Sequence, residues 1–191
     1  MVRQQRTIKT QFAYEGLGLH TGKPVKVVFR PAPASTGIRF RRVDLSPPVE
    51  ISASVDSIHS GEIRRNTTLA KGNVVIHTVE HILAAASGLQ IDNLAVDIDS
   101  EEPPEPRDGS CASFVEALQK AGFVNQGVPV KYLRINSPVS FCEDGVELHA
   151  LPYDGLKVSF TIEYANPHIG IQYASSSGIV DPQVFNRKVT R

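Results

Sequence analysis

The stretch His77-Thr78-Val79-Glu80-His81-Ile82-Leu83-Ala84-Ala85-Ala86 carries the clearest helical pattern of this 191-residue chain. Its apolar positions 79, 82, 83 and 86 recur at i, i+3, i+4 and i+7, so they share one face of a helix turned toward a core. At about 100° per residue, His81 lies on the opposite side, His77 lies nearly in line with it, and Glu80 lies between. The pattern predicts an amphipathic helix over residues 78–88.

The polar side of this helix has the composition of a hydrolytic site. Neutral imidazole binds Zn²⁺, and a neighbouring carboxylate can take a proton from water activated by the metal. His77, Glu80 and His81 therefore indicate metal-assisted hydrolysis. The alternative is that these side chains are simply solvated, as polar residues on an outer helix face usually are.

A zinc protease is a further alternative, because His77-x-x-Glu80-His81 matches the H-x-x-E-H pattern of that class. There a glutamate on a downstream helix supplies the third ligand. The late carboxylates of this chain lie instead in strand-like patterns, at Glu143, Glu147 and Glu163.

Composition excludes several functional classes. Lys plus Arg and Asp plus Glu each total 20, so a net charge of +0 provides no global field for nucleic acid or an anionic membrane. With no apolar run typical of a signal peptide or a membrane span, we expect a cytoplasmic protein. Cys111 and Cys142 are too few for a disulfide framework or a thiolate zinc site, and both are expected to be buried.

The first part of the chain is expected to form an α+β domain over residues 1–126. Asp108 is predicted to cap a second helix that ends at Gly122, a role that fits it better than partnering Ser110 as a nucleophile, since no Gly-x-Ser-x-Gly motif surrounds that serine. Alternating patterns predict strands at residues 6–14, 24–31, 38–43 and 93–99, with short ones at 54–58 and 67–70.

A second unit is expected over residues 130–191, after a linker at Gly127-Val128-Pro129. Its strands, at 130–141, 146–153 and 156–164, predict a meander with turns at Asp144-Gly145 and Asp154-Gly155, followed by a strand at 169–174. A helix then opens at Asp181. About 62 residues are marginal for an independent core, so we expect this domain to be incomplete.

Two further groups have ambiguous roles. Gly16-Leu17-Gly18-Leu19-His20-Thr21-Gly22 lacks the spacing of a dinucleotide site and indicates a tight connection. His20 within it is either a ligand-binding residue or merely exposed. An arginine group would suit a phosphorylated ligand, although solvated strand faces explain it equally well; its members are Arg39, Arg41, Arg42, Arg64 and Arg65.

Taken in order, the motifs resemble the amino-terminal part of the UDP-3-O-acyl-N-acetylglucosamine deacetylases, the zinc amidases of lipid A biosynthesis. The resemblance covers essentially the whole chain. Its motifs are Gln5-Arg6-Thr7, the glycine-rich segment, Arg30-Pro31-Ala32-Pro33-Ala34, Arg41-Arg42-Val43-Asp44-Leu45, Thr78-Val79-Glu80-His81, Gly88-Leu89-Gln90-Ile91-Asp92-Asn93, Asp108-Gly109-Ser110, Phe160-Thr161-Ile162-Glu163-Tyr164 and Asn166-Pro167-His168.

This resemblance implies an α+β fold of two-layer sheet/helix sandwich domains, the first complete and the second, of the same type, truncated. The family's Thr-Val-Glu-His motif implies that Glu80 is the general base and His81 a zinc ligand, and it leaves His77 without a role. His20 would lie near the substrate, a UDP-linked acyl-aminosugar. Tyr164 would lie beside its acyl group.

The family's other zinc ligands, a histidine and an aspartate in an H-x-x-x-D run, would lie beyond Arg191, together with its acid histidine. The 191-residue chain is therefore expected to be catalytically incomplete. A non-catalytic nucleotide-sugar-binding fragment and, third, the metalloprotease remain as alternatives.

Overall fold

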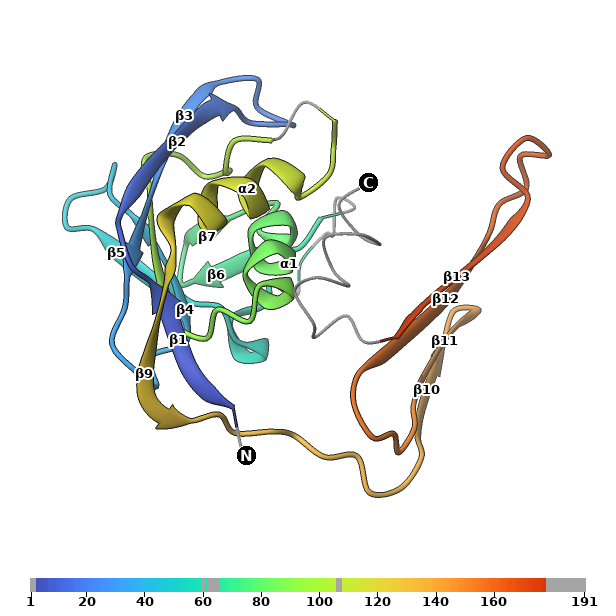
Figure 1. Cartoon of the computed structure of the whole chain (residues 1–191). Helices are drawn as coiled ribbons and strands as arrows, with labels where there is room; N and C mark the ends of the chain where they lie inside the picture. The colour runs from blue at the N-terminus through green and yellow to red at the C-terminus, as the bar shows by residue number, and fades with distance from the viewer. Residues whose placement is uncertain (1–2, 60, 62–65, 106–107, 178–191) are drawn as a thin grey trace.

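A computed structural model describes residues 3–59, 61, 66–105 and 108–177 (Figure 1). Its largest sheet has five strands in the order β2 (Phe12–Leu17), β3 (Pro24–Pro31), β8 (Leu94–Ile98), β4 (Ile38–Arg42) and β5 (Val49–Ser52). Neighbours are antiparallel except β4 and β8, which are parallel. Two smaller sheets accompany it: β1 (Gln4–Ile8) pairs with β9 (Phe123–Pro129), and β6 (Leu69–Lys71) pairs with β7 (Val74–Ile76).

Two helices form the second layer of this part of the molecule. Helix α1 (Glu80–Gly88) and helix α2 (Ala112–Ala121) lie against each other on one side of the large sheet (Figure 1). Phe114 of α2 packs edge-on against Phe29 of β3, with ring centroids 6.1 Å apart. The α+β, sheet-and-helix fold class is confirmed.

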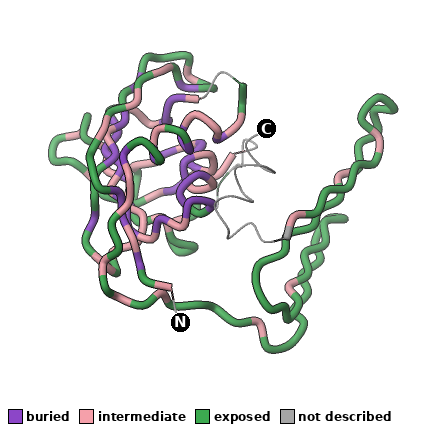
Figure 2. Tube along the Cα trace, in the orientation of Figure 1, coloured by how far each residue is buried: buried purple, intermediate pink, exposed green. Residues whose placement is uncertain are grey.

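The core lies between these layers, where Figure 2 shows the buried residues. Alternate residues of β3 are buried, as expected for a strand with one face on a core: Val25, Val27 and Phe29. The predicted apolar face of α1 is confirmed, because Val79, Ile82 and Ala86 are buried and Leu83 packs against the same cluster.

Several element boundaries differ from the prediction. The expected strand at 6–14 is two strands, and residues 55–57 form the 3-10 turn η1 (Val55–Ser57) in place of a strand. The linker prediction is wrong, since residues 127–129 belong to β9 and Pro129 pairs with Gln4. A break in register between Gln4 and Arg6 accommodates Gly127, whose φ is +69°. A bulge therefore explains the glycine that resembled a linker residue.

The remaining described residues form two antiparallel hairpins instead of one meander. β10 (Val139–Glu143) pairs with β11 (Val146–Ala150), and β12 (Lys157–Glu163) pairs with β13 (Ile171–Ser177). The predicted Asp144-Gly145 turn is confirmed, and both of its residues have the positive φ of a two-residue hairpin turn, +48° and +77°. The helix predicted at Asp181 lies outside the described residues.

Most residues of these hairpins are exposed (Figure 2). For this reason the prediction that both cysteines are buried is wrong for one of them. Cys111 at the start of α2 is buried, but Cys142 of β10 is exposed. Within the described part of the chain, neither helix has the length and apolarity needed to cross a bilayer.

Candidate active site

A buried carboxylate that the sequence did not single out binds the loop of His20. Glu102 is 1% exposed, and its Oε1 lies 2.6 Å from Nδ1 of His20. The same carboxylate accepts hydrogen bonds from the backbone N–H groups of His20 and Thr21, at 3.0–3.1 Å. The Thr78 hydroxyl donates a further one, at 3.0 Å. Glu102 thus joins the glycine-rich loop to the residue two positions before α1.

Sheet topology explains this meeting of distant segments. Leu17 at the end of β2 is paired with Pro24 at the start of β3, and Ile98 at the end of β8 is paired with Val27. The connections that follow β2 and β8 therefore leave the sheet at the same end. They stay together there, because Glu105 N–H donates to the Leu17 carbonyl at 2.9 Å and Gly18 forms a bridge with Pro104.

The protonation of Glu102 follows from these contacts. Burial raises its pKa, but the hydrogen bonds from the His20 ring, Thr21, Thr78 and the His20 backbone lower it more, so the net pKa lies below its usual value. Glu102 is therefore an ionised carboxylate near neutral pH, with only acceptor capacity.

Thr78 decides where α1 begins. Its φ is +54°, in the left-handed region, and α1 starts two residues later at Glu80. His77 consequently precedes the helix: its backbone N–H donates to the Glu101 carbonyl at 2.8 Å, and its Nδ1 lies 2.9 Å from the Thr68 hydroxyl. The predicted alignment of His77 with His81 on one helix face is wrong. The two histidines of the H-x-x-E-H pattern therefore do not lie on one helix, as the protease alternative requires.

Glu80 and His81 occupy the first turn of α1. Oε2 of Glu80 accepts a hydrogen bond from the Thr67 backbone N–H at 2.9 Å. Nε2 of His81 lies 3.6 Å from Oε1 of Glu105, and both side chains are largely buried, 24% and 11% exposed. A carboxylate in the first helical turn is also favoured by the helix dipole. Glu80 and His81 therefore lie in a partly desolvated position, close to the carboxylate of Glu105.

Electrostatics connect these groups into one site. Burial raises the pKa of Glu105, and the negative charges of Glu80 and Glu102 raise it further, against the opposing influence of His81 and His20. The structure thus brings together three of the four predicted site residues. Sequence reasoning missed Glu102 and Glu105, whose only signal was their place in an acidic, proline-rich loop.

Tyr164 is not part of this cluster. It follows β12, is 53% exposed, and its backbone N–H donates to the Gly170 carbonyl at 3.0 Å. In Figure 1 its hairpin lies apart from α1.

Gly18 is required for the close packing at Glu102. A Cβ atom there would lie 2.3 Å from Oγ1 of Thr21 and 2.6 Å from Oε2 of Glu102. Both distances are far below van der Waals contact, and Glu102 has little space to move because it is buried. The glycine therefore permits the loop around Thr21 and the buried carboxylate of Glu102 to lie against the same stretch of backbone.

We expect Gly18→Ala to destabilise the chain by about 1–3 kcal/mol, the usual cost of overpacking. Chemical denaturation followed by circular dichroism measures the change. Leu19→Ala, at a 58% exposed position in the same loop, is the control and should change stability by no more than about 0.5 kcal/mol. Equal stability of Gly18→Ala and the parent chain would contradict the close approach described here.

The strand arginines are paired with neighbouring acids. Arg39 contacts Glu50 at 2.6 Å, Arg42 contacts Asp44 at 2.7 Å, and Arg41 makes two hydrogen bonds to Asp97, at 2.8 and 2.9 Å. Structural ion pairs account for these three residues, whereas Arg64 and Arg65 lie outside the described residues.

Asp108 does not cap α2 as predicted. Its oxygens accept hydrogen bonds from the backbone and hydroxyl of Ser110, at 3.0 and 2.9 Å. The helix begins at Ala112, after Cys111 at its N-cap, and Ser110 Oγ accepts the Ala112 N–H at 3.1 Å. Asp108 therefore stabilises the turn, and Ser110 takes over the capping contact.

The imidazole of His81, with carboxylates nearby, is suited to be one ligand of a metal site. An imidazole with an adjacent carboxylate is suitable chemistry for zinc. Nevertheless, the described residues contain no cluster of three or more His, Cys, Asp or Glu side chains able to enclose a metal ion. His81 can thus contribute one of the three protein ligands that a catalytic zinc requires.

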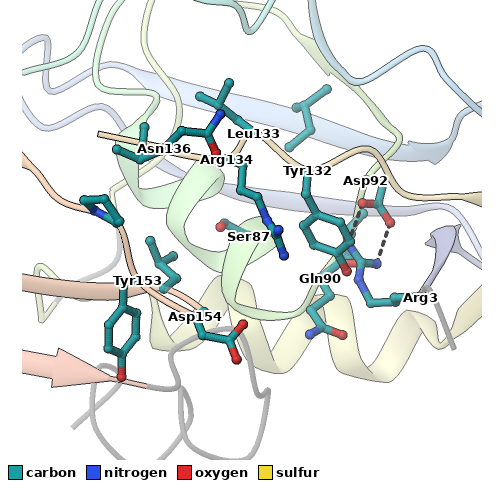
Figure 3. A pocket seen from close by; sticks show the side chains of 16 residues that line it. Arg3, Ser87, Gln90, Asp92, Tyr132, Leu133, Arg134, Asn136, Tyr153 and Asp154 are labelled. Carbon is teal, nitrogen blue, oxygen red and sulfur yellow. Dashed lines mark hydrogen bonds and ion pairs between the residues drawn. The ribbon is translucent and has the colours of Figure 1, made fainter. Parts of the chain in front are cut away.

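A separate cavity of about 1360 Å³ adjoins the other end of α1 (Figure 3). Its described lining includes Tyr132, Arg134 and Tyr153, and Arg3, which makes two hydrogen bonds to Asp92 at 2.7 and 2.8 Å. The predicted site residues are not among its described lining residues, so it is distinct from the cluster at Glu80.

Comparison with known proteins agrees with the motif order. A family model described as UDP-3-O-acyl N-acetylglycosamine deacetylase (LpxC) matches residues 5–191. The chain is 48% identical, over 87% of its length, to a UDP-3-O-acyl-N-acetylglucosamine deacetylase of Thioalkalivibrio sulfidiphilus, and 42% identical, over 100% of its length, to one of Pseudomonas entomophila. It is also 41% identical, over 95% of its length, to the bifunctional enzyme LpxC/FabZ of Chlorobaculum tepidum.

The chain spans only part of these relatives, namely 54%, 62% and 38% of their respective lengths. The family model nevertheless extends over nearly all of the chain, including the five-stranded sheet, the two hairpins that follow β9, and the residues Glu80, His81, Glu102 and Glu105. This chain therefore belongs to the UDP-3-O-acyl N-acetylglycosamine deacetylase family.

Proposed function

We propose that the full-length protein removes the N-acetyl group of a UDP-linked 3-O-acyl-N-acetylglucosamine, as a zinc-dependent step of lipid A biosynthesis in the cytoplasm. The observation that carries this proposal is the pairing of Glu80 and His81 in the first turn of α1, beside Glu105 and the Glu102–His20 contact. The deacetylase names of the relatives support the same reaction.

In this reaction Glu80 is the general base. The Thr67 N–H holds Oε2, which orients the carboxylate and leaves Oε1 to accept a proton from the water that attacks the acetyl carbonyl. A zinc ion held in part by His81 would supply Lewis-acid polarisation of the reacting groups. His20 contacts the nucleotide sugar, and Tyr164 lies beside the acyl chain.

We also propose two domains, residues 1–126, to which the rest of β9 up to Pro129 is added, and residues 130–191, with the second completed by a further part of the full-length protein. That part supplies the remaining zinc ligands. Because one imidazole does not hold a catalytic zinc, the 191-residue chain alone binds the nucleotide sugar without turning it over.

Zinc content tests this assignment. We expect about one zinc per full-length chain and well below half of that in His81→Ala. His77→Ala is the matched control, since His77 contacts Thr68 outside α1, and it should retain its metal. Metal and acetate release are measured on the same samples, with a UDP-linked 3-O-acyl-N-acetylglucosamine as substrate. Stoichiometric zinc in His81→Ala, or equal metal loss in His77→Ala, would contradict the proposal.

A further inference from the structure

We propose that Glu102 is a positioning residue for His20: it holds the imidazole with Nδ1 protonated and leaves Nε2 to accept a hydrogen bond from a hydroxyl group of the nucleotide sugar. This inference rests on the proposed function, in which His20 binds substrate. It concerns a residue outside the Thr-Val-Glu-His motif, identified by its contacts.

The tautomer follows from hydrogen-bond chemistry. An ionised carboxylate accepts hydrogen bonds and donates none. At 2.6 Å from Oε1 of Glu102, Nδ1 of His20 must therefore be the donor. The other partners of the carboxylate are donors as well, namely two backbone N–H groups and the Thr78 hydroxyl. In a neutral ring with Nδ1 protonated, Nε2 is an acceptor.

The contact also fixes the orientation of the ring. Glu102 binds His20 through both its backbone N–H and its Nδ1, so the side chain is restrained relative to its own main chain. Without this restraint a side chain that is 44% exposed would sample several rotamers. The carboxylate itself has little space to move, because it is buried and a Cβ atom at Gly18 would lie 2.6 Å from its Oε2.

Glu102 further connects His20 to the catalytic end of α1. The Thr78 hydroxyl donates to Oε1 of Glu102 and lies 3.4 Å from Nδ1 of His20. Thr78 is two residues before Glu80, in the left-handed conformation that starts the helix. These contacts fix the position of His20 relative to the proposed base, Glu80. A loop histidine in contact with solvent alone would have no such fixed position.

The first test is NMR of the 191-residue chain labelled with ¹⁵N-histidine, at a pH where the rings are neutral. Two-bond ¹⁵N–¹H correlations should show His20 with Nδ1 protonated and Nε2 unprotonated. Glu102→Gln leaves one acceptor oxygen for the His20 and Thr21 N–H groups and the Thr78 hydroxyl, and its amide group donates toward Nδ1. His20 should therefore shift toward the Nε2-protonated form that free imidazole side chains prefer. Glu101→Gln is the matched control, because that neighbouring carboxylate interacts with Arg42, and it should leave the spectrum of His20 unchanged.

An Nε2-protonated His20 in the parent chain would overturn the proposal without any variant, so the test survives if Glu102→Gln fails to fold. An unchanged tautomer in a folded Glu102→Gln chain, judged by backbone amide dispersion, would overturn it as well. Neither measurement depends on turnover.

The second test uses the full-length protein. Glu102→Gln should raise KM for the UDP-linked substrate by about 2- to 10-fold, the value of a lost hydrogen bond between the neutral His20 ring and a substrate hydroxyl, with zinc content and kcat little changed. Adding Glu102→Gln to His20→Ala should have no further effect on KM, because both changes remove one contact. Additive effects of the two changes, or an unaltered KM, would overturn the positioning role. Failure of the parent protein to release acetate would instead refute the proposed function.

Discussion

Replacing Glu80 by glutamine in the full-length protein is expected to lower kcat for deacetylation by about 10²–10⁴-fold, the range that general base catalysis contributes. Glutamine keeps the size of the side chain and its oxygen can still accept from the Thr67 N–H, but the amide does not take a proton from water. Because the lost interaction belongs to the transition state, KM should change little. Initial rates of acetate release over a range of substrate concentrations separate the two constants.

Two controls restrict the interpretation of Glu80→Gln. Its zinc content should equal that of the parent protein, since His81 and the other proposed zinc ligands are unchanged. Glu116→Gln makes the same chemical change at an exposed position of α2 and should leave kcat within about twofold. A metal-loaded Glu80→Gln protein with the parent kcat would exclude Glu80 as the base.

Replacing Phe29 by alanine should cost about 3–5 kcal/mol of stability, as deletion of a buried aromatic ring usually does. Phe29 is 0% exposed, stacks on Phe12 at 4.8 Å between ring centroids, and meets Phe114 of α2 edge-on. The substitution removes the ring by which β3 holds both its neighbouring strand and the helical layer. We expect the thermal midpoint of the 191-residue chain to fall by roughly 10–20 °C.

Phe141→Ala is the matched control for Phe29→Ala. It deletes the same ring at a position on β10 that is 57% exposed, so less than about 1 kcal/mol should be lost. Differential scanning calorimetry of both variants gives the comparison. Similar losses in the two would contradict the location of the core between the large sheet and its helices.

Local patterns of the sequence were sufficient for the elements whose signals lie within a few residues. The apolar face of α1, the alternation of β3 and the end of α2 at Gly122 were all predictable in this way. The Asp144-Gly145 turn was predictable for the same reason, since its positive φ angles suit these residues. Glu80 and His81 could be predicted as candidates because they are adjacent and lie off the apolar face of the helix, with His81 on the opposite side.

The tertiary structure alone decided which polar groups share the site. His20 and Glu102 are 82 residues apart in sequence. They meet because β2 and β8 finish at the same end of one sheet and because Gly18 allows the segments that follow these strands to touch. His77 was separated from His81 by the left-handed turn at Thr78, a conformation that helical periodicity does not reveal. Periodicity reports which face of an element is apolar, whereas the meeting of distant carboxylates and imidazoles depends on strand order and on space between backbones.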